Sequence, residues 1–426
     1  MKKIIAVLVV FALFAGAAFG GDIADGMYFN AWNKGTFVPL KYVTAPQVDG
    51  KTNDGAEGEA FTGGGVSWGG ARVRAGFNVG ADSEMVGWKA ELHAEDMGVG
   101  DWAYVYAKPF GSDILKLSMG HFLEDGLRGK FGGLTLGDYI GIGSGEDAIF
   151  SRIGTGGEDK GNFSTRTALL ISSSPIDGLF IGLKLNGYIF DNWGSEEFPI
   201  TYTANSFRYM QLAAGYNIAN IGHIRAQYLG GWFGEIDRND EDTAKYLAAS
   251  NDKPARIEAA FALTAIDGLL IDLGGKFYFP QKFKGTGEER TDGAAFSLAA
   301  KFNAGIFGIF FRSDLTGLGA YNRVNNSDKS AEAMKMAFVL EPTFGFDFGT
   351  VGFDVGFAVN GESKDTSGNG KEDNTTQLGF GAFFEKNLGK GNINVGLVYK
   401  LPANGKNGAN GSGFFEVPIS IVASFF

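Results

Sequence analysis

The chain of 426 residues lacks cysteine altogether and has only 3 histidines and 10 prolines. Without cysteine it can form no disulfide, no thiolate metal site and no lipid attachment at a cysteine side chain. The histidines, His93, His121 and His223, are not accompanied by a Gly-x-Ser-x-Gly element. We therefore expect no catalytic site, no cofactor and no metal site.

Long apolar runs and basic stretches are also missing from most of the chain. After residue 20, no apolar run approaches the roughly 20 residues that a membrane-spanning helix needs, which excludes a helical membrane protein. The formal net charge is −11 and no basic stripe is visible, so nucleic acid is not an expected partner. Much of the acidity lies in polar segments such as 235–242 and 362–373, as is typical of solvated loops.

The one strongly apolar run lies at the N-terminus. A short cationic segment, Met1-Lys2-Lys3, is followed by an apolar run from Ile4 to Phe14 and then by small residues. Ala18-Phe19-Gly20 offers a cleavage site of the small-x-small type. We predict a signal peptide over residues 1–20, followed by a single barrel domain over residues 21–426.

Glycine and phenylalanine are abundant instead, with 67 and 39 residues, and the chain alternates with a period of two. The alternation is clearest in residues 71–95, where apolar side chains alternate with a polar set that includes Arg72, Arg74 and Lys89. A Lys or Arg facing lipid near the midplane costs about 2–4 kcal/mol, and a domain's whole stability is about 5–15 kcal/mol. The charged faces of these strands must therefore line water.

The connections between the alternating segments are short and long in turn. The short ones are 81–84, 111–113, 175–178, 220–222, 266–268, 303–305, 349–350 and 389–391. On the other side, the segment near 96–100 is short, and the long polar connections are 42–65, 123–161, 191–201, 235–253, 280–292, 316–331, 361–375 and 402–411. Short periplasmic turns and long extracellular loops are the pattern of bacterial outer-membrane barrels.

Counting the segments predicts an all-β fold, a closed antiparallel transmembrane barrel of about 18 strands, with 16 as the alternative. The first strand begins near Tyr28 and the last one ends the chain. Pro39 and Pro418 fall in the first and last strands, which meet where the barrel closes. Because proline lacks a backbone donor, we expect this seam to be locally irregular.

The last ten residues, Val417 to Phe426, alternate apolar with small or polar side chains and end on Phe-Phe. This ending resembles the C-terminal signal of outer-membrane β-barrels, in which a final Phe is read by the barrel-assembly machinery. Counting back, Ile421 and Phe425 share the apolar face, whereas Phe426 falls on the channel side. With its signal peptide, strand count and turn pattern, the chain resembles a porin.

The resemblance implies a location in the outer membrane, contact with its lipids and no enzymatic activity. Barrels of 16–18 strands enclose an aqueous channel, so the implied function is passive diffusion of ions and small hydrophilic solutes. Because porins often form trimers, a homotrimer is one expected assembly. A transporter of hydrophobic substrates gated by a hatch of residues 21–65, and a surface-exposed structural or adhesin barrel, remain as alternatives.

The longest connection, 123–161, is the third on the long-loop side, after 42–65 and the segment near 96–100, and porins fold this third loop into the lumen as a constriction. The resemblance thus implies that charged residues of this loop face a basic wall and set a transverse field that tunes ion preference. The predicted constriction residues are Arg72, Arg74 and Lys89 on the wall and Glu124, Asp125, Arg128 and Lys130 in the loop.

Two further expectations concern the wall itself. Other charges with channel-side parity are Lys116, Arg166, Lys184, Arg225, Arg256, Asp272, Lys276, Lys301, Asp347, Asp354 and Lys400. Trp102, Tyr104 and Tyr106 share one parity. They form either an aromatic girdle at the membrane interface or a stacking track for sugars inside the channel.

Overall fold

The structure of the chain is a computed structural model. It describes residues 27–44, 54–55, 72–93, 99–121, 123–124, 153–154, 168–186, 210–237, 254–323, 330–331, 334–360, 375–401, 404–405 and 413–425. All regular structure in these segments is β-strand. None of them contains a helix long and apolar enough to cross a membrane.

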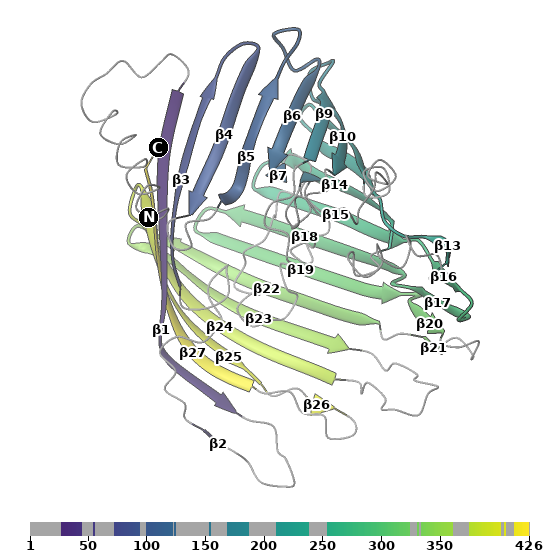
Figure 1. Cartoon of the computed structure of the whole chain (residues 1–426). Helices are drawn as coiled ribbons and strands as arrows, with labels where there is room; N and C mark the ends of the chain where they lie inside the picture. Colours follow the sequence, from purple (N-terminus) through teal and green to yellow (C-terminus); the bar gives the residue numbers. More distant parts are fainter. Residues whose placement is uncertain are drawn as a thin grey trace, which may run out of the picture.

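Eighteen antiparallel strands form a closed barrel, as predicted (Figure 1). The first nine are β1 (Met27–Thr44), β3 (Arg72–Asp82), β4 (Val86–His93), β5 (Val99–Ala107), β6 (Lys116–His121), β9 (Ala168–Ser173), β10 (Leu179–Asn186), β11 (Gln211–Ile218) and β12 (Gly222–Leu229). The other nine are β14 (Arg256–Ile266), β15 (Leu269–Tyr278), β18 (Ala294–Ala304), β19 (Phe307–Leu318), β22 (Lys335–Phe346), β23 (Gly349–Asn360), β24 (Thr375–Asn387), β25 (Gly391–Lys400) and β27 (Gly413–Phe425). Each strand pairs with the next in this order, and two short strands, β2 (Asp54–Gly55) and β26 (Asn404–Gly405), extend the same sheet.

The barrel closes where β1 pairs with both β27 and β3. The register of β1 against β27 shifts between Phe37 and Leu40, the position of Pro39, which confirms the predicted irregular seam. Met27 lies opposite Ala81, next to a short turn. The described start of the chain therefore lies at the rim that carries the short turns.

Glycines and aromatic rings face each other across neighbouring strands, which accounts for part of the unusual composition. At Gly76, Gly87 and Gly352 the aromatic side chain lies where a Cβ of the glycine would stand, so a larger residue would collide with it, and at Gly275 a Cβ would lie 3.1 Å from the ring, in tight contact. The directly opposed pairs are Gly76 with Trp32, Gly87 with Tyr106, Gly275 with Phe296, and Gly352 with Phe383. The wall is thus packed by rings lying flat over glycines, which lets large side chains fit on a tightly curved surface.

A second sheet joins three of the long connections beyond the barrel (Figure 1). Its strands are β13 (Gly234–Asp237), β16 (Gln281–Lys284), β17 (Glu288–Thr291), β20 (Tyr321–Arg323) and β21 (Ser330–Ala331). Trp232, Ile236 and Phe283 form its buried apolar core. The sequence predicted solvated loops here. They order because each contributes a short strand to one sheet, and β13 pairs with β16 in parallel, so a contact distant in sequence forms the ladder.

A third ladder joins the ends of the longest connection. Its strands, β7 (Leu123–Glu124) and β8 (Ile153–Gly154), pair antiparallel. The residues between them, including the predicted inward fold of the loop, lie outside the described segments.

Candidate functional site on the inner face of the barrel

Alternation along each strand separates an inner from an outer face. In β14, Arg256, Glu258 and Ala260 are buried, whereas Ile257 and Ala259 between them are exposed. In β12 the same alternation buries Arg225, Gln227 and Leu229 and exposes the residues between them to different degrees. The buried set points to the inside of the barrel, because it carries the charges and pairs across successive strands.

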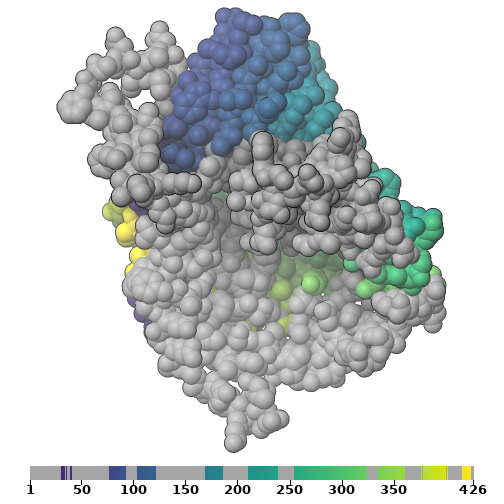
Figure 2. Space-filling view, in the orientation of Figure 1, coloured from purple at the N-terminus to yellow at the C-terminus, as the bar shows by residue number. Residues whose placement is uncertain are grey.

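The outer face carries large apolar side chains that are exposed around the barrel, and Figure 2 shows the outer surface of β3 to β6 in dark blue. Members from strands around the ring include Trp88, Val105, Met119, Ile181, Leu212, Ile224, Ile257, Leu273, Phe296, Leu340, Val355, Phe380, Leu397 and Ile421. Soluble monomers do not expose so large an apolar surface. A closed barrel with an apolar outer band and a charged interior is the form in which strands cross the bacterial outer membrane, and this chain is an outer-membrane β-barrel of that class.

The densest polar group on the inner face is centred on Glu258 of β14, which is fully buried. Gln227 Nε2 donates a hydrogen bond of 2.6 Å to Glu258 Oε2, and Arg256 Nε donates one of 2.8 Å to Oε1. Lys276 Nζ lies 4.0 Å from the same Oε1. Because Gln227, Glu258 and Lys276 stand directly opposite one another on β12, β14 and β15, the strand register places these groups together.

A second ion pair lies beside the Glu258 group. Arg225 Nη2 donates a hydrogen bond of 2.6 Å to Asp272 Oδ1, and the side chains are only 1% and 2% exposed. The two residues lie on β12 and β15, and Ala260 and Ala262 of the intervening β14 face them across the register. These small residues leave room for the guanidinium to reach over one strand.

The tyrosine–lysine patch (Tyr104, Tyr106 and Lys116) lies farther along the wall, near the short turns. Tyr104 and Tyr106 stand opposite Lys89 and Gly87 of β4, and their ring centroids are 6.2 Å apart. The Tyr106 hydroxyl donates a hydrogen bond to Asp82. Lys116 Nζ lies 4.4 Å from the Tyr106 ring centroid. Since these rings have inner-face parity, the predicted interface girdle is wrong for Tyr104 and Tyr106.

The predicted constriction is only partly within the described structure. Lys89 lies on the inner face of β4, half-buried, in the same parity as buried Glu91. Arg72 and Arg74 lie in β3 in the register that Asn78 continues, and their side chains are outside the described set. Glu124 belongs to β7, with its side chain likewise undescribed. Asp125, Arg128 and Lys130 lie wholly outside the described residues.

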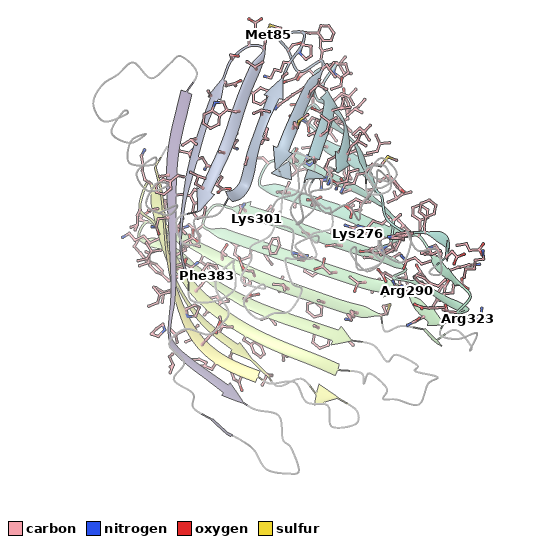
Figure 3. The ribbon with its side chains drawn as sticks, viewed as in Figure 1. Met85, Lys276, Arg290, Lys301, Arg323 and Phe383 are labelled. Atoms are coloured by element: carbon pink, nitrogen blue, oxygen red, sulfur yellow. The ribbon has the colours of Figure 1, made fainter. Side chains whose placement is uncertain are left out.

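The wider set of predicted channel charges gave a mixed outcome. Six are buried on the inner face as predicted by parity, namely Lys184, Arg225, Arg256, Asp272, Lys276 and Asp354. Their near-complete burial differs from the expectation that they line water. Lys301, labelled in Figure 3, is exposed at the rim, and Asp347 is exposed in a turn outside the wall. Arg166 and the side chain of Lys400 are not described.

Sequence reasoning predicted Asp272 and Asp354 but missed two other carboxylates of the inner wall. Glu258 and Glu416 are both fully buried, and Glu91 accepts a hydrogen bond of 3.3 Å from Trp32 Nε1. Parity alone could have found Glu258, because it alternates in phase with Arg256. Its partners Gln227 and Lys276 depend on the register of two neighbouring strands, which the sequence does not specify.

Comparisons with known proteins give only distant similarities. No protein-family model and no curated protein matches the chain. Among solved structures it is similar to OpdL of Pseudomonas aeruginosa, with 8% identity, a TM-score of 0.48, and 95% of this chain and 99% of that one covered. It is also similar to an anion-selective porin from Comamonas acidovorans, with 13% identity, a TM-score of 0.42 and coverage of 94% and 100%. The barrel architecture rests on the strand pairing above.

Proposed function

We propose that the chain is an outer-membrane porin, a channel for passive diffusion of ions and small hydrophilic solutes. The observation that carries the proposal is the division of an 18-stranded wall into an apolar outer face and a charged inner face. Barrels of this size are wide enough to enclose an aqueous path. A half-buried charge on the inner face, such as Lys89, would favour hydrated solutes over apolar ones.

Conductance tests the proposal directly. Purified protein reconstituted in a planar lipid bilayer should open stable, ohmic steps in 1 M salt. A refolded barrel that leaves the membrane closed would overturn the porin proposal and favour the adhesin or structural alternative. Folding is checked separately by resistance to SDS at room temperature, so that a closed membrane is not confused with unfolded protein.

The constriction remains part of the proposal. Reversing the charges of Arg72 and Arg74 to Glu should shift the zero-current potential in a salt gradient toward cations, because a fixed wall charge repels ions of its own sign. A matched reversal at Lys390, exposed in the short turn between β24 and β25, should shift it far less. Equal shifts of the zero-current potential would show that Arg72 and Arg74 do not lie at the narrowest point of the channel.

The hatch alternative is weakened by the first strand. Within the segment 21–65, residues 27–44 form β1, which pairs with β3 and β27 in the wall, and residues 54–55 pair with β1. They are therefore not available to plug the lumen. Outer-membrane lipids, a homotrimeric assembly and recognition of Phe426 by the assembly machinery belong to the same porin proposal, with Phe426 outside the described residues.

A further inference from the structure

The short turns at one rim of the barrel carry large apolar side chains, although Gly, Pro, Asn, Asp and Ser dominate turns that face water. All eight short turns lie within the described residues, and each has at least one apolar side chain that is 45–68% exposed. Met85, labelled in Figure 3, is the first of them along the chain. This set, here the apolar rim, consists of Met85, Phe110, Ile114, Ile176, Ile221, Ile266, Ile306, Phe348 and Leu388.

The apolar rim is continuous with the outer face of the wall. The Phe348 ring stacks on Phe346, with centroids 5.2 Å apart, and on Phe384, with centroids 6.2 Å apart. Phe384 has the same parity on β24 as the exposed Phe380, and both face outward. Because the apolar side chains recur on every short turn, whatever covers them must surround the barrel. A lipid leaflet surrounds it, whereas a protein partner would cover one sector.

Two of the turns repeat one module, Ile176-Asp177-Gly178 and Ile266-Asp267-Gly268. The glycines have positive φ, 79° and 74°. The Gly178 carbonyl accepts a hydrogen bond of 2.8 Å from the backbone N–H of Asn217 on the next strand. The Gly268 carbonyl accepts one of 2.7 Å from the backbone N–H of Asn303 in the same way. The same backbone geometry therefore presents an apolar side chain and a carboxylate next to each other at two places on the rim.

The carboxylates of these turns are open to a cation from outside the chain. Asp177 and Asp267 are exposed, and so is Asp347, which directly precedes Phe348. Within the described part of the chain, none of the three forms an ion pair or a side-chain hydrogen bond. A carboxylate gains most from a cation that also donates N–H hydrogen bonds to it. These turns thus have the charge that complements an ammonium group and not the charge that complements a phosphate.

We propose that the turns at Asp177, Asp267 and Asp347 bind the primary-ammonium headgroups of phospholipids in the periplasmic leaflet. The apolar side chain beside each carboxylate lies among the glycerol and acyl groups and sets its depth. The carboxylate accepts hydrogen bonds from the headgroup ammonium. The proposal goes beyond the channel function and does not depend on it, since only the rim and the outer face take part.

The test compares phosphatidylethanolamine with phosphatidylcholine, which has the same net charge but no N–H donor. Each lipid is titrated into the refolded barrel in detergent, and native mass spectrometry counts the bound molecules. Phosphatidylethanolamine should bind about 1.5-fold to 5-fold more tightly, the range that one exposed ion pair supports. The triple variant Asp177→Asn/Asp267→Asn/Asp347→Asn should lose this preference, and because Asn suits the same turns the barrel should still fold.

The matched control removes three carboxylates from the five-stranded sheet, at the other end of the barrel, by Glu235→Gln/Asp237→Asn/Glu288→Gln. It should keep the preference for phosphatidylethanolamine. Equal affinity of the unmodified protein for the two lipids, or an unchanged preference in the rim variant, overturns the recognition of the headgroup.

A second measurement tests whether the apolar rim meets lipid. Since the chain has no cysteine, a single fluorescent label can be placed at Ile266→Cys or, as the control, at Lys284→Cys, which is 60% exposed on the five-stranded sheet. In vesicles, iodide should quench the label at residue 266 severalfold less than the label at residue 284. Equal quenching would overturn the lipid contact and leave the rim facing a periplasmic protein. Neither measurement uses conductance, so a barrel that stays closed would overturn the porin proposal alone.

Discussion

The buried pair of Arg225 and Asp272 gives the sharpest test of how the inner wall is built. The groups are 2.6 Å apart and 1% and 2% exposed. Replacing Asp272 by Asn keeps the shape and removes the charge that faces the guanidinium. Breaking one partner of a buried pair costs about 3–5 kcal/mol, because the remaining charge stays desolvated. Breaking a solvated pair would cost only about 0.2–1 kcal/mol. The expected loss of unfolding free energy therefore differs severalfold between a buried and a solvated pair.

The measurement is the free energy of unfolding of the refolded barrel in lipid vesicles, from urea titrations followed by tryptophan fluorescence. Asp237→Asn is the matched control, since it breaks the pair between Lys284 Nζ and Asp237 Oδ2, 3.3 Å apart and 60% and 38% exposed. We expect the control to stay within about 1 kcal/mol of the unmodified protein. The double variant Arg225→Met/Asp272→Leu should recover most of the loss, since a buried pair can be replaced by apolar residues at little cost.

A loss below about 1 kcal/mol for Asp272→Asn would refute the reasoning. It would mean that water reaches the pair, and the inner wall at β12 and β15 would then line an open aqueous path, as the sequence pattern alone suggested. A large loss without recovery in the double variant would instead assign the cost to shape and packing around Ala260 and Ala262.

Three further substitutions test other parts of the fold. Leu273→Lys places a charge in the middle of the outer face of β15 and should cost about 2–4 kcal/mol of unfolding free energy in vesicles; no loss would mean that this face does not meet lipid. Trp232→Ala should remove the core of the five-stranded sheet, at about 3–5 kcal/mol, and expose the outer connections to protease while the barrel stays SDS-resistant, whereas an unchanged digestion pattern would contradict this role. Gly352→Ala should destabilise the barrel by about 1–3 kcal/mol through collision with Phe383, and Phe383→Ala should relieve part of that loss; equal stability of Gly352→Ala and the unmodified protein would show that the ring can move aside.

The fold followed from the sequence to a large extent. Alternation with a period of two fixed which residues share a face, so the inward placement of Lys184, Arg256 and Asp354 was predicted correctly. Alternating short and long connections gave the strand number, and the proline in the first strand marked the shifted register between Phe37 and Leu40. These features are local, because a strand's two faces and its breaks depend only on neighbouring residues.

The candidate site was predicted less well from the sequence than the fold. Tyr104 and Tyr106 share a parity, but parity does not say which face is inside, and only the exposure of Val105 between them in the folded barrel placed the rings inward. The sequence pattern likewise predicted separate loops at 235–253, 280–292 and 316–331, whereas residues from all three form one sheet. Contacts between segments far apart in the chain have no local signal.

By itself, the sequence determined a two-faced, closed antiparallel wall, because every membrane-facing strand must be apolar on one side and paired along both edges. Only the tertiary structure decided which inward charges meet. Strand register set Gln227, Glu258 and Lys276 in one row and brought Asp272 over β14 to Arg225. It left Lys116 over a tyrosine ring with no described carboxylate beside it. Those neighbours depend on register and curvature, which arise only when all the strands close into one barrel.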